Sequence, residues 1–209
     1  MGDHIDKTIA VYNSIAPSYA QKVKELAPEQ ERQKFVALLH PKAKLLDVGC
    51  AAGRDSLYFT QKNLKVTGID LSEKLLEYAK ITAPQATFLK EDVRYISFPS
   101  ESFDGIWVNA VLLHLKRQEI PEVLAKFYQL LRKSGVLFVS LKKGKGEGSI
   151  TEPLSQEQPR FFTFYEESEI KQLITQTGFS IIELYTRHAQ DRGPDTRNID
   201  WIFCFARKV

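Results

Sequence analysis

Short apolar runs of strand length alternate along this chain with stretches whose apolar residues recur every three or four positions. The expected strands are residues 45–48, 66–69, 86–90, 103–108, 136–141, 179–188 and 201–206. Helical spacing lies between them, most clearly over residues 120–131. Strands that alternate with helices predict an α/β domain built on a parallel sheet. Residues 103–108 and 201–206 are apolar almost throughout, which predicts strands buried on both faces.

Two regions outside this alternation have patterns of their own. An apolar stripe runs from Ile5 to Leu26, and Pro17 is expected to interrupt it or to start a helix there. Two short helices are therefore predicted before the first strand, and the second starts after Pro28 and ends near Leu39. Residues 142–160 contain glycines and prolines among charges and show no apolar period, which predicts a long loop bordering a binding pocket. Thr163 and Glu166 have the spacing of a capping box, which predicts that a helix starts there.

Composition narrows the class of protein. The 209 residues, 43% of them hydrophobic, suffice for one domain with a substantial core. No apolar run is long enough for a membrane span and the first residues lack a signal-peptide pattern, so a cytoplasmic protein without a membrane partner is expected. With 29 basic and 26 acidic residues the charge is balanced and gives no argument for nucleic acid by itself. Two cysteines, Cys50 and Cys204, form neither a disulfide framework nor a metal cluster, and no metal is predicted.

The most informative stretch is the turn between the first strand and the next helix. Small residues from Gly49 to Gly53 end the strand, and the following strand ends at Asp70, where a carboxylate can accept hydrogen bonds from both hydroxyls of a ribose. A dinucleotide site requires G-x-G-x-x-G, but the three glycine positions are occupied by Gly49, Ala51 and Arg54. The turn therefore fits the dinucleotide pattern poorly, and it predicts either a nucleoside site of another kind or a plain connection between a strand and a helix.

Read from Asp47, the pattern Asp47-x-Gly49-x-Ala51-x-Gly53 resembles the first motif of class I S-adenosyl-L-methionine (SAM) dependent methyltransferases, D/E-x-G-x-G-x-G, with alanine in place of the middle glycine. This resemblance implies a doubly wound, Rossmann-like sheet of seven mostly parallel strands in the order 3-2-1-4-5-7-6, with an antiparallel last strand. It also implies one methyltransferase domain over residues 1–209, with a helical lid over residues 1–40 and a substrate-side loop over residues 142–162. The cofactor residues that it implies are Tyr12, Tyr19, Asp47, Gly49, Cys50, Ala51, Gly53, Asp70, Leu71, Asp92, Val93, Asn109 and Ala110.

Roles for several of these residues follow from the same resemblance. Tyr12 and Tyr19 match a Y-x-x-x-A-x-x-Y lid that closes over the cofactor, although each tyrosine also suits helix packing. Asp92 has the place of the acid that binds the adenine amino group, and a solvated turn is the alternative. Residues 109–115 resemble the fourth motif of methyltransferases that do not act on nucleic acid, which sets Asn109 at the methyl-donor end. His114 is the candidate catalytic base, with packing as the alternative.

The methyl acceptor is less well determined. Aromatic and basic residues suit a small anionic or aromatic molecule, or else belong to the core. The expected substrate-binding residues are Tyr19, His114, Arg160, Tyr165 and Arg192. The expected activity is direct methyl transfer from SAM to a small-molecule acceptor. Three alternatives remain open, namely methylation of a modified wobble uridine in tRNA, a nicotinamide-dependent oxidoreductase and a non-catalytic SAM binder. The oligomeric state is also open.

Overall fold

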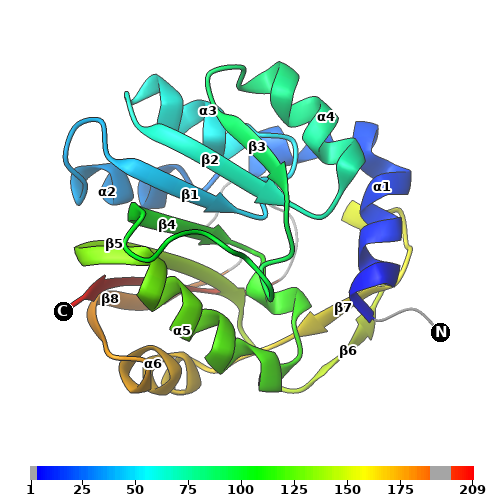
Figure 1. The fold of residues 1–209 in the computed structure, drawn as a ribbon. Helices are drawn as coiled ribbons and strands as arrows, with labels where there is room; N and C mark the ends of the chain where they lie inside the picture. Colours follow the sequence, from blue (N-terminus) through cyan, green and yellow to red (C-terminus); the bar gives the residue numbers. More distant parts are fainter. Residues whose placement is uncertain (1–3, 189–198) are drawn as a thin grey trace.

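The computed structural model describes residues 4–188 and 199–209, and its centre is a sheet of seven strands in the order β3-β2-β1-β4-β5-β9-β8 (Figure 1). The strands are β1 (Lys44–Val48), β2 (Lys65–Asp70), β3 (Thr87–Lys90), β4 (Phe103–Asn109), β5 (Leu131–Lys142), β8 (Phe179–Arg187) and β9 (Trp201–Lys208). β9 runs antiparallel to both β5 and β8, while the other neighbours are parallel. Because β6 and β7 lie outside this sheet, the order is the predicted 3-2-1-4-5-7-6, and the predicted fold class is confirmed.

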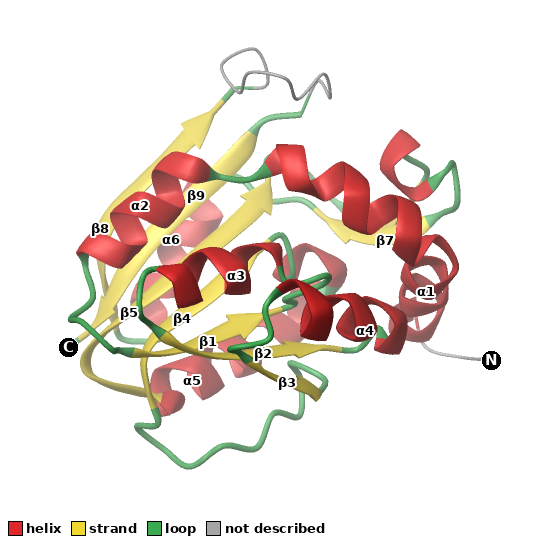
Figure 2. Ribbon diagram, turned by 90° about the horizontal axis from the view of Figure 1, so that it is seen from above, coloured by secondary structure: helices red, strands yellow, loops and turns green. Residues whose placement is uncertain are grey.

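Helices cover both faces of the sheet (Figure 2). One face carries α2 (Glu29–Ala37), α3 (Arg54–Gln61) and α4 (Glu73–Thr82), and the other carries α5 (Ile120–Leu130) and α6 (Glu167–Gln176). The start of α4 follows from its sequence, since the Ser72 hydroxyl accepts a hydrogen bond from the Leu75 amide at 3.2 Å and so caps the helix.

The core is packed around the central strand β4. Its Trp107 is fully buried and stacks on Phe138 of β5, with ring centroids 3.8 Å apart. Phe35 and Phe59 meet the Trp107 ring edge-on from α2 and α3. The apolar run of residues 103–108 is therefore buried on both faces, as its composition predicts.

The N-terminal segment differs from its prediction in one respect. The helix predicted from Pro28 to about Leu39 is present as α2 (Glu29–Ala37), but no interruption occurs at Pro17. A single helix α1 (His4–Lys22) continues through this proline and is followed by the short 3-10 helix η1 (Val23–Leu26). Proline removes one hydrogen bond of the helix, but Ile15, Ala16 and Ala20 are buried on both sides of it, and this packing holds the helix together.

The predicted loop over residues 142–160 is also wrong in part. It contains β6 (Glu147–Ile150), which forms an antiparallel hairpin with β7 (Arg160–Thr163), and the short 3-10 helix η4 (Pro153–Ser155) between them. The hairpin lies beside α1 (Figure 1). Thr163 belongs to β7 and its hydroxyl donates to the Leu115 carbonyl, so it does not cap a helix; α6 starts instead at a capping box of Glu166 and Glu169.

Candidate functional site

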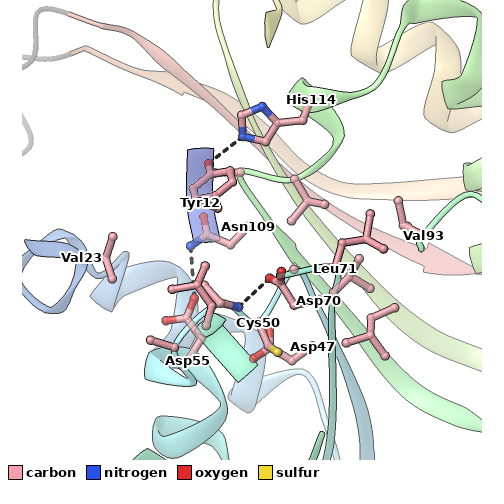
Figure 3. Close-up of a pocket in the computed structure, with 18 of the residues that line it drawn as sticks. Tyr12, Val23, Asp47, Cys50, Asp55, Asp70, Leu71, Val93, Asn109 and His114 are labelled. Atoms are coloured by element: carbon pink, nitrogen blue, oxygen red, sulfur yellow. Dashed lines mark hydrogen bonds between the residues drawn. The ribbon is translucent and has the colours of Figure 1, made fainter. Parts of the chain in front are cut away.

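A cavity opens at the carboxyl ends of β1, β2 and β4, and α1 closes one side of it (Figure 3). Every expected cofactor residue except Gly53 lines this cavity, and so does His114. The residues brought together in this way are Tyr12, Tyr19, Asp47, Gly49, Cys50, Ala51, Asp70, Leu71, Asp92, Val93, Asn109, Ala110 and His114. Open α/β sheets place their ligands at this edge.

The turn between β1 and α3 has a backbone that only small residues tolerate. Gly49, Ala51 and Gly53 all have positive φ, at 64°, 47° and 80°. A Cβ atom on Gly49 would lie 2.3 Å from Cγ2 of Val111, so glycine is required there for space as well as for conformation. The alanine in place of the motif's middle glycine adopts the left-handed conformation in spite of its Cβ atom.

Asp70 connects the end of β2 to this turn. Its Oδ2 accepts a hydrogen bond from the Ala51 amide at 2.9 Å, and its Oδ1 accepts one from the Ser72 amide at 2.8 Å. Burial raises the pKa of this carboxyl group, and the backbone hydrogen bonds oppose the rise. Each carboxylate oxygen has a further lone pair with which it can accept a hydrogen bond from a ligand.

Asp55, which sequence reasoning missed, is the most strongly bound acid of the site. It accepts hydrogen bonds from Arg54 at 2.7 and 2.8 Å, from Arg32 at 3.2 Å, from the Trp107 indole at 3.1 Å and from the Asn109 amide at 3.2 Å. Figure 3 shows the last of these bonds. The only sequence signal for Asp55 is a carboxylate in the first turn of α3, and that signal says nothing about partners from α2 and β4.

Asp47 lies next to Asp55 in a different environment. It is buried and accepts a hydrogen bond from the Ser56 hydroxyl at 2.5 Å. Burial, together with the negative charge of Asp55, raises the pKa of Asp47 to about 8. Burial also acts on Asp55, but Arg54 and Arg32 outweigh it and lower the pKa of Asp55 to about 2.

Asp92 lies at the cavity with its carboxylate held by Arg94. The Arg94 side chain donates to Asp92 Oδ2 at 2.6 and 3.0 Å, and the Arg94 amide donates to Oδ1 at 2.9 Å. The Arg94 side chain also donates to Glu119 at 3.2 Å. Asp92 is thus fixed in an ion pair rather than standing in a solvated turn.

On the α1 side of the cavity, Tyr12 contacts His114 and Arg160. The Tyr12 hydroxyl lies 2.9 Å from His114 Nε2 (Figure 3) and accepts a hydrogen bond from Arg160 Nη1 at 2.6 Å. Tyr19 packs edge-on against the Tyr12 ring, with centroids 5.0 Å apart. The two tyrosines of the predicted lid therefore both pack against each other and line the cavity.

The remaining expected substrate residues are placed differently. Arg160 lies behind Tyr12 and does not itself line the cavity. Tyr165 is buried away from the cavity, with the Arg117 guanidinium 4.4 Å from its ring centroid, and burial raises its pKa to about 12. Arg192 lies outside the described residues. Within the described part of the chain, no helix has both the length and the apolar character needed to cross a membrane.

Comparison with known proteins finds similarity to methyltransferases. Residues 45–135 match the family model described as a methyltransferase domain. The chain is 30% identical over 132 residues to the putative methyltransferase YqeM of Bacillus subtilis, covering 61% of this chain and 53% of YqeM. It is 26% identical over 175 residues to the trans-aconitate 2-methyltransferase of Enterobacter sp., covering 76% and 65% of the two chains. The match to YqeM thus spans about half of that relative's length.

Solved structures share the fold. A SAM-dependent methyltransferase from Methanosarcina mazei has a TM-score of 0.73 at 20% identity, covering 83% of this chain and 95% of that one. The 1,6-didemethyltoxoflavin-N1-methyltransferase of Burkholderia thailandensis, solved with 1,6-didemethyltoxoflavin and S-adenosylhomocysteine bound, has a TM-score of 0.71 at 22% identity, covering 100% and 92%. At these identities the likeness establishes the shared architecture.

Proposed function

We propose that the chain is a class I SAM-dependent methyltransferase and that it transfers the methyl group of SAM to a small-molecule acceptor. The transfer proposed is a direct displacement that leaves S-adenosylhomocysteine. The observation that carries the proposal is the bonding of Asp70 to the left-handed turn at Ala51, because it fixes a carboxylate where the ribose of a nucleoside would lie.

The residues of the cavity fit the parts of such a cofactor. We assign the ribose hydroxyls to Asp70, which keeps acceptor capacity on both oxygens. The adenine would lie among Leu71, Asp92 and Val93, which combine apolar surface with a fixed carboxylate. The methionine end would lie toward Asn109 and the Gly49 turn, where the negative charge of Asp55 suits its positive charges.

When bound, SAM supplies an electrophilic methyl group, so the task of the protein is alignment and exclusion of water. The buried carboxylates and the amides of the turn orient the nucleoside, and Tyr12 and Tyr19 cover the α1 side of the cavity. The acceptor would enter between α1 and the segment that follows β4. His114 of this segment lines the cavity there, and so do Leu154 of η4 and Trp201 of β9.

A small-molecule acceptor has two sources of support. The names of two relatives, the trans-aconitate 2-methyltransferase and the 1,6-didemethyltoxoflavin-N1-methyltransferase, specify small acceptors for those proteins. The α1 side of the cavity is lined by apolar and aromatic side chains with few polar groups, as small-molecule pockets usually are.

Calorimetric titration tests this function. SAM and S-adenosylhomocysteine are expected to bind the wild-type protein, and NADH is not. Asp70→Ala is expected to weaken SAM binding at least about tenfold, because charge-assisted hydrogen bonds to the ribose are lost. Glu77→Ala removes a carboxylate from the exposed face of α4 and serves as the matched control, with unchanged affinity. An Asp70→Ala protein that is folded and binds SAM as the wild type does would disprove the assigned site.

A further inference from the structure

Tyr12, His114 and Arg160 form a chain of hydrogen bonds in which each donor can be identified. His114 Nδ1 lies 2.7 Å from the carbonyl oxygen of Phe161, and since a carbonyl only accepts, Nδ1 carries the imidazole proton. His114 Nε2 therefore accepts the proton of the Tyr12 hydroxyl. The phenol oxygen of Tyr12 in turn accepts from Arg160 Nη1.

This arrangement makes His114 a positioning residue rather than a base. The lone pair of Nε2 is already used by Tyr12, and both ring nitrogens are bound within the protein. Burial, and then the positive charge of Arg160, lower the pKa of His114 to about 3. The imidazole orients the Tyr12 hydroxyl at the cavity wall, as Figure 3 shows, and is poorly suited to take a proton from an acceptor.

Arg160 brings a positive charge close to this wall. The residue is 2% exposed, and its guanidinium carbon lies 5.0 Å from the centroid of the Tyr12 ring. Its Nη2 pairs with Glu152 at 2.7 Å, but the same carboxylate also pairs with Lys142. Among the described residues, the buried Nε atom of Arg160 has no hydrogen-bond partner. Arg160 and Lys142 thus share the Glu152 carboxylate, and an anion bound beyond Tyr12 would be attracted to the guanidinium.

Building on the proposed methyl transfer, we propose that the acceptor is a small carboxylic acid and that a carboxylate oxygen receives the methyl group. A lone pair of this oxygen forms the new O–C bond while the C–S bond breaks and its electron pair goes to sulfur. The products are a methyl ester and S-adenosylhomocysteine, and the charges of the carboxylate and the sulfonium cancel. No proton is transferred, so the reaction needs no base and is compatible with the bonded state of His114.

Binding of benzoate and benzamide to the complex with S-adenosylhomocysteine tests the proposal, because the two molecules share a shape and differ in charge. Calorimetry is expected to show that wild-type protein binds benzoate at least about tenfold more tightly than benzamide. Arg160→Gln is expected to abolish this preference and Arg160→Lys to retain most of it. Glu152→Gln, which removes the carboxylate shared by Lys142 and Arg160, is expected to increase the preference.

Affinity for S-adenosylhomocysteine, measured in each variant, shows whether the cofactor side is intact. Misfolding can only weaken the preference for benzoate over benzamide, whereas Glu152→Gln is expected to strengthen it. This variant therefore tests the charge argument even if Arg160→Gln is unstable. Equal affinity of the wild-type complex for benzoate and benzamide would overturn the proposal, as would methyl transfer from SAM to benzyl alcohol or benzylamine in preference to benzoate. A wild-type protein that binds no S-adenosylhomocysteine would instead overturn the methyltransferase function itself.

Discussion

Asp47 and Asp55 are neighbouring buried carboxyl groups whose surroundings shift their pKa values in opposite directions. Arg54 and Arg32 overcome the burial of Asp55 and lower its pKa to about 2. Among the described residues, Asp47 has only the Ser56 hydroxyl as a hydrogen-bond donor, and burial together with the charge of Asp55 raises its pKa to about 8. At pH 7 the folded protein therefore holds a proton on Asp47 and a negative charge on Asp55.

The proton on Asp47 makes stability depend on pH. Because the pKa of Asp47 is about 8 in the folded protein against 3.8 for an ordinary aspartate, the folded state binds a proton that the unfolded state releases between these values. The free energy of unfolding therefore falls as pH rises from about 4 to about 8, by at most about 1.4 kcal/mol per pH unit from this group. Asp47→Asn stays neutral, so we expect its stability to fall less with pH.

Urea denaturation of the wild type and of Asp47→Asn at pH 5, 6, 7 and 8, without cofactor, measures this difference. Glu77→Gln, which neutralises an exposed carboxylate of α4, is expected to follow the wild type. Parallel curves for the wild type and Asp47→Asn would show that Asp47 is ionised in the folded protein.

Replacing Ala51 by glycine should stabilise the protein. Ala51 has φ of 47°, and an alanine in this left-handed conformation costs about 1 kcal/mol or more. Glycine removes that cost but adds freedom to the unfolded chain, so a net gain of up to about 1 kcal/mol is expected, or a rise in Tm of about 2–4 °C. Ala52→Gly in the same turn has no positive φ to relieve and loses a buried methyl group, so calorimetry should show a lower Tm.

Replacing Gly49 by alanine should destabilise the protein strongly. The added Cβ atom would lie 2.3 Å from Cγ2 of Val111, at a φ of 64° that alanine disfavours. Strain and overpacking together are expected to cost about 2–4 kcal/mol in chemical denaturation. Gly148→Ala is the matched control, since its added Cβ atom meets nothing within 4 Å and its φ is not positive. A similar effect of both substitutions would show that the turn has room to adjust.

The sequence predicts the sheet well because its signals are local. The strands of the sheet, the turn from Gly49 to Gly53 and the acid at Asp70 follow from apolar runs and small residues, whereas the order of the strands follows from the resemblance to class I methyltransferases. Pro17 shows where a local rule fails, since burial on both sides of it keeps α1 continuous. The β6–β7 hairpin was missed because its short strands have no apolar alternation and are held by pairing with each other.

The polar network of the site is the part that local patterns cannot predict. Asp55 meets Arg32 from 23 positions earlier in the chain and Trp107 from 52 positions later. Tyr12 meets His114 across 102 positions and Arg160 across 148. These contacts depend on how the helices dock on the sheet, so a single sequence indicates candidate residues for the network without indicating their partners.

Removing the Asp55 carboxylate should be among the most damaging changes at this site. Asp55→Ala leaves the guanidinium groups of Arg32 and Arg54 without their shared buried carboxylate, a loss expected to cost about 3–5 kcal/mol in urea denaturation at pH 7. Asp55→Asn keeps an acceptor oxygen but loses the charge. It should therefore also lower the free energy of unfolding, but by less than Asp55→Ala does. Glu77→Ala removes an exposed ion pair with Lys74 and should change stability by less than about 0.5 kcal/mol. If Asp55→Ala were as stable as Glu77→Ala, the two guanidinium groups would have to find other partners, and Asp55 would not be the centre of the network.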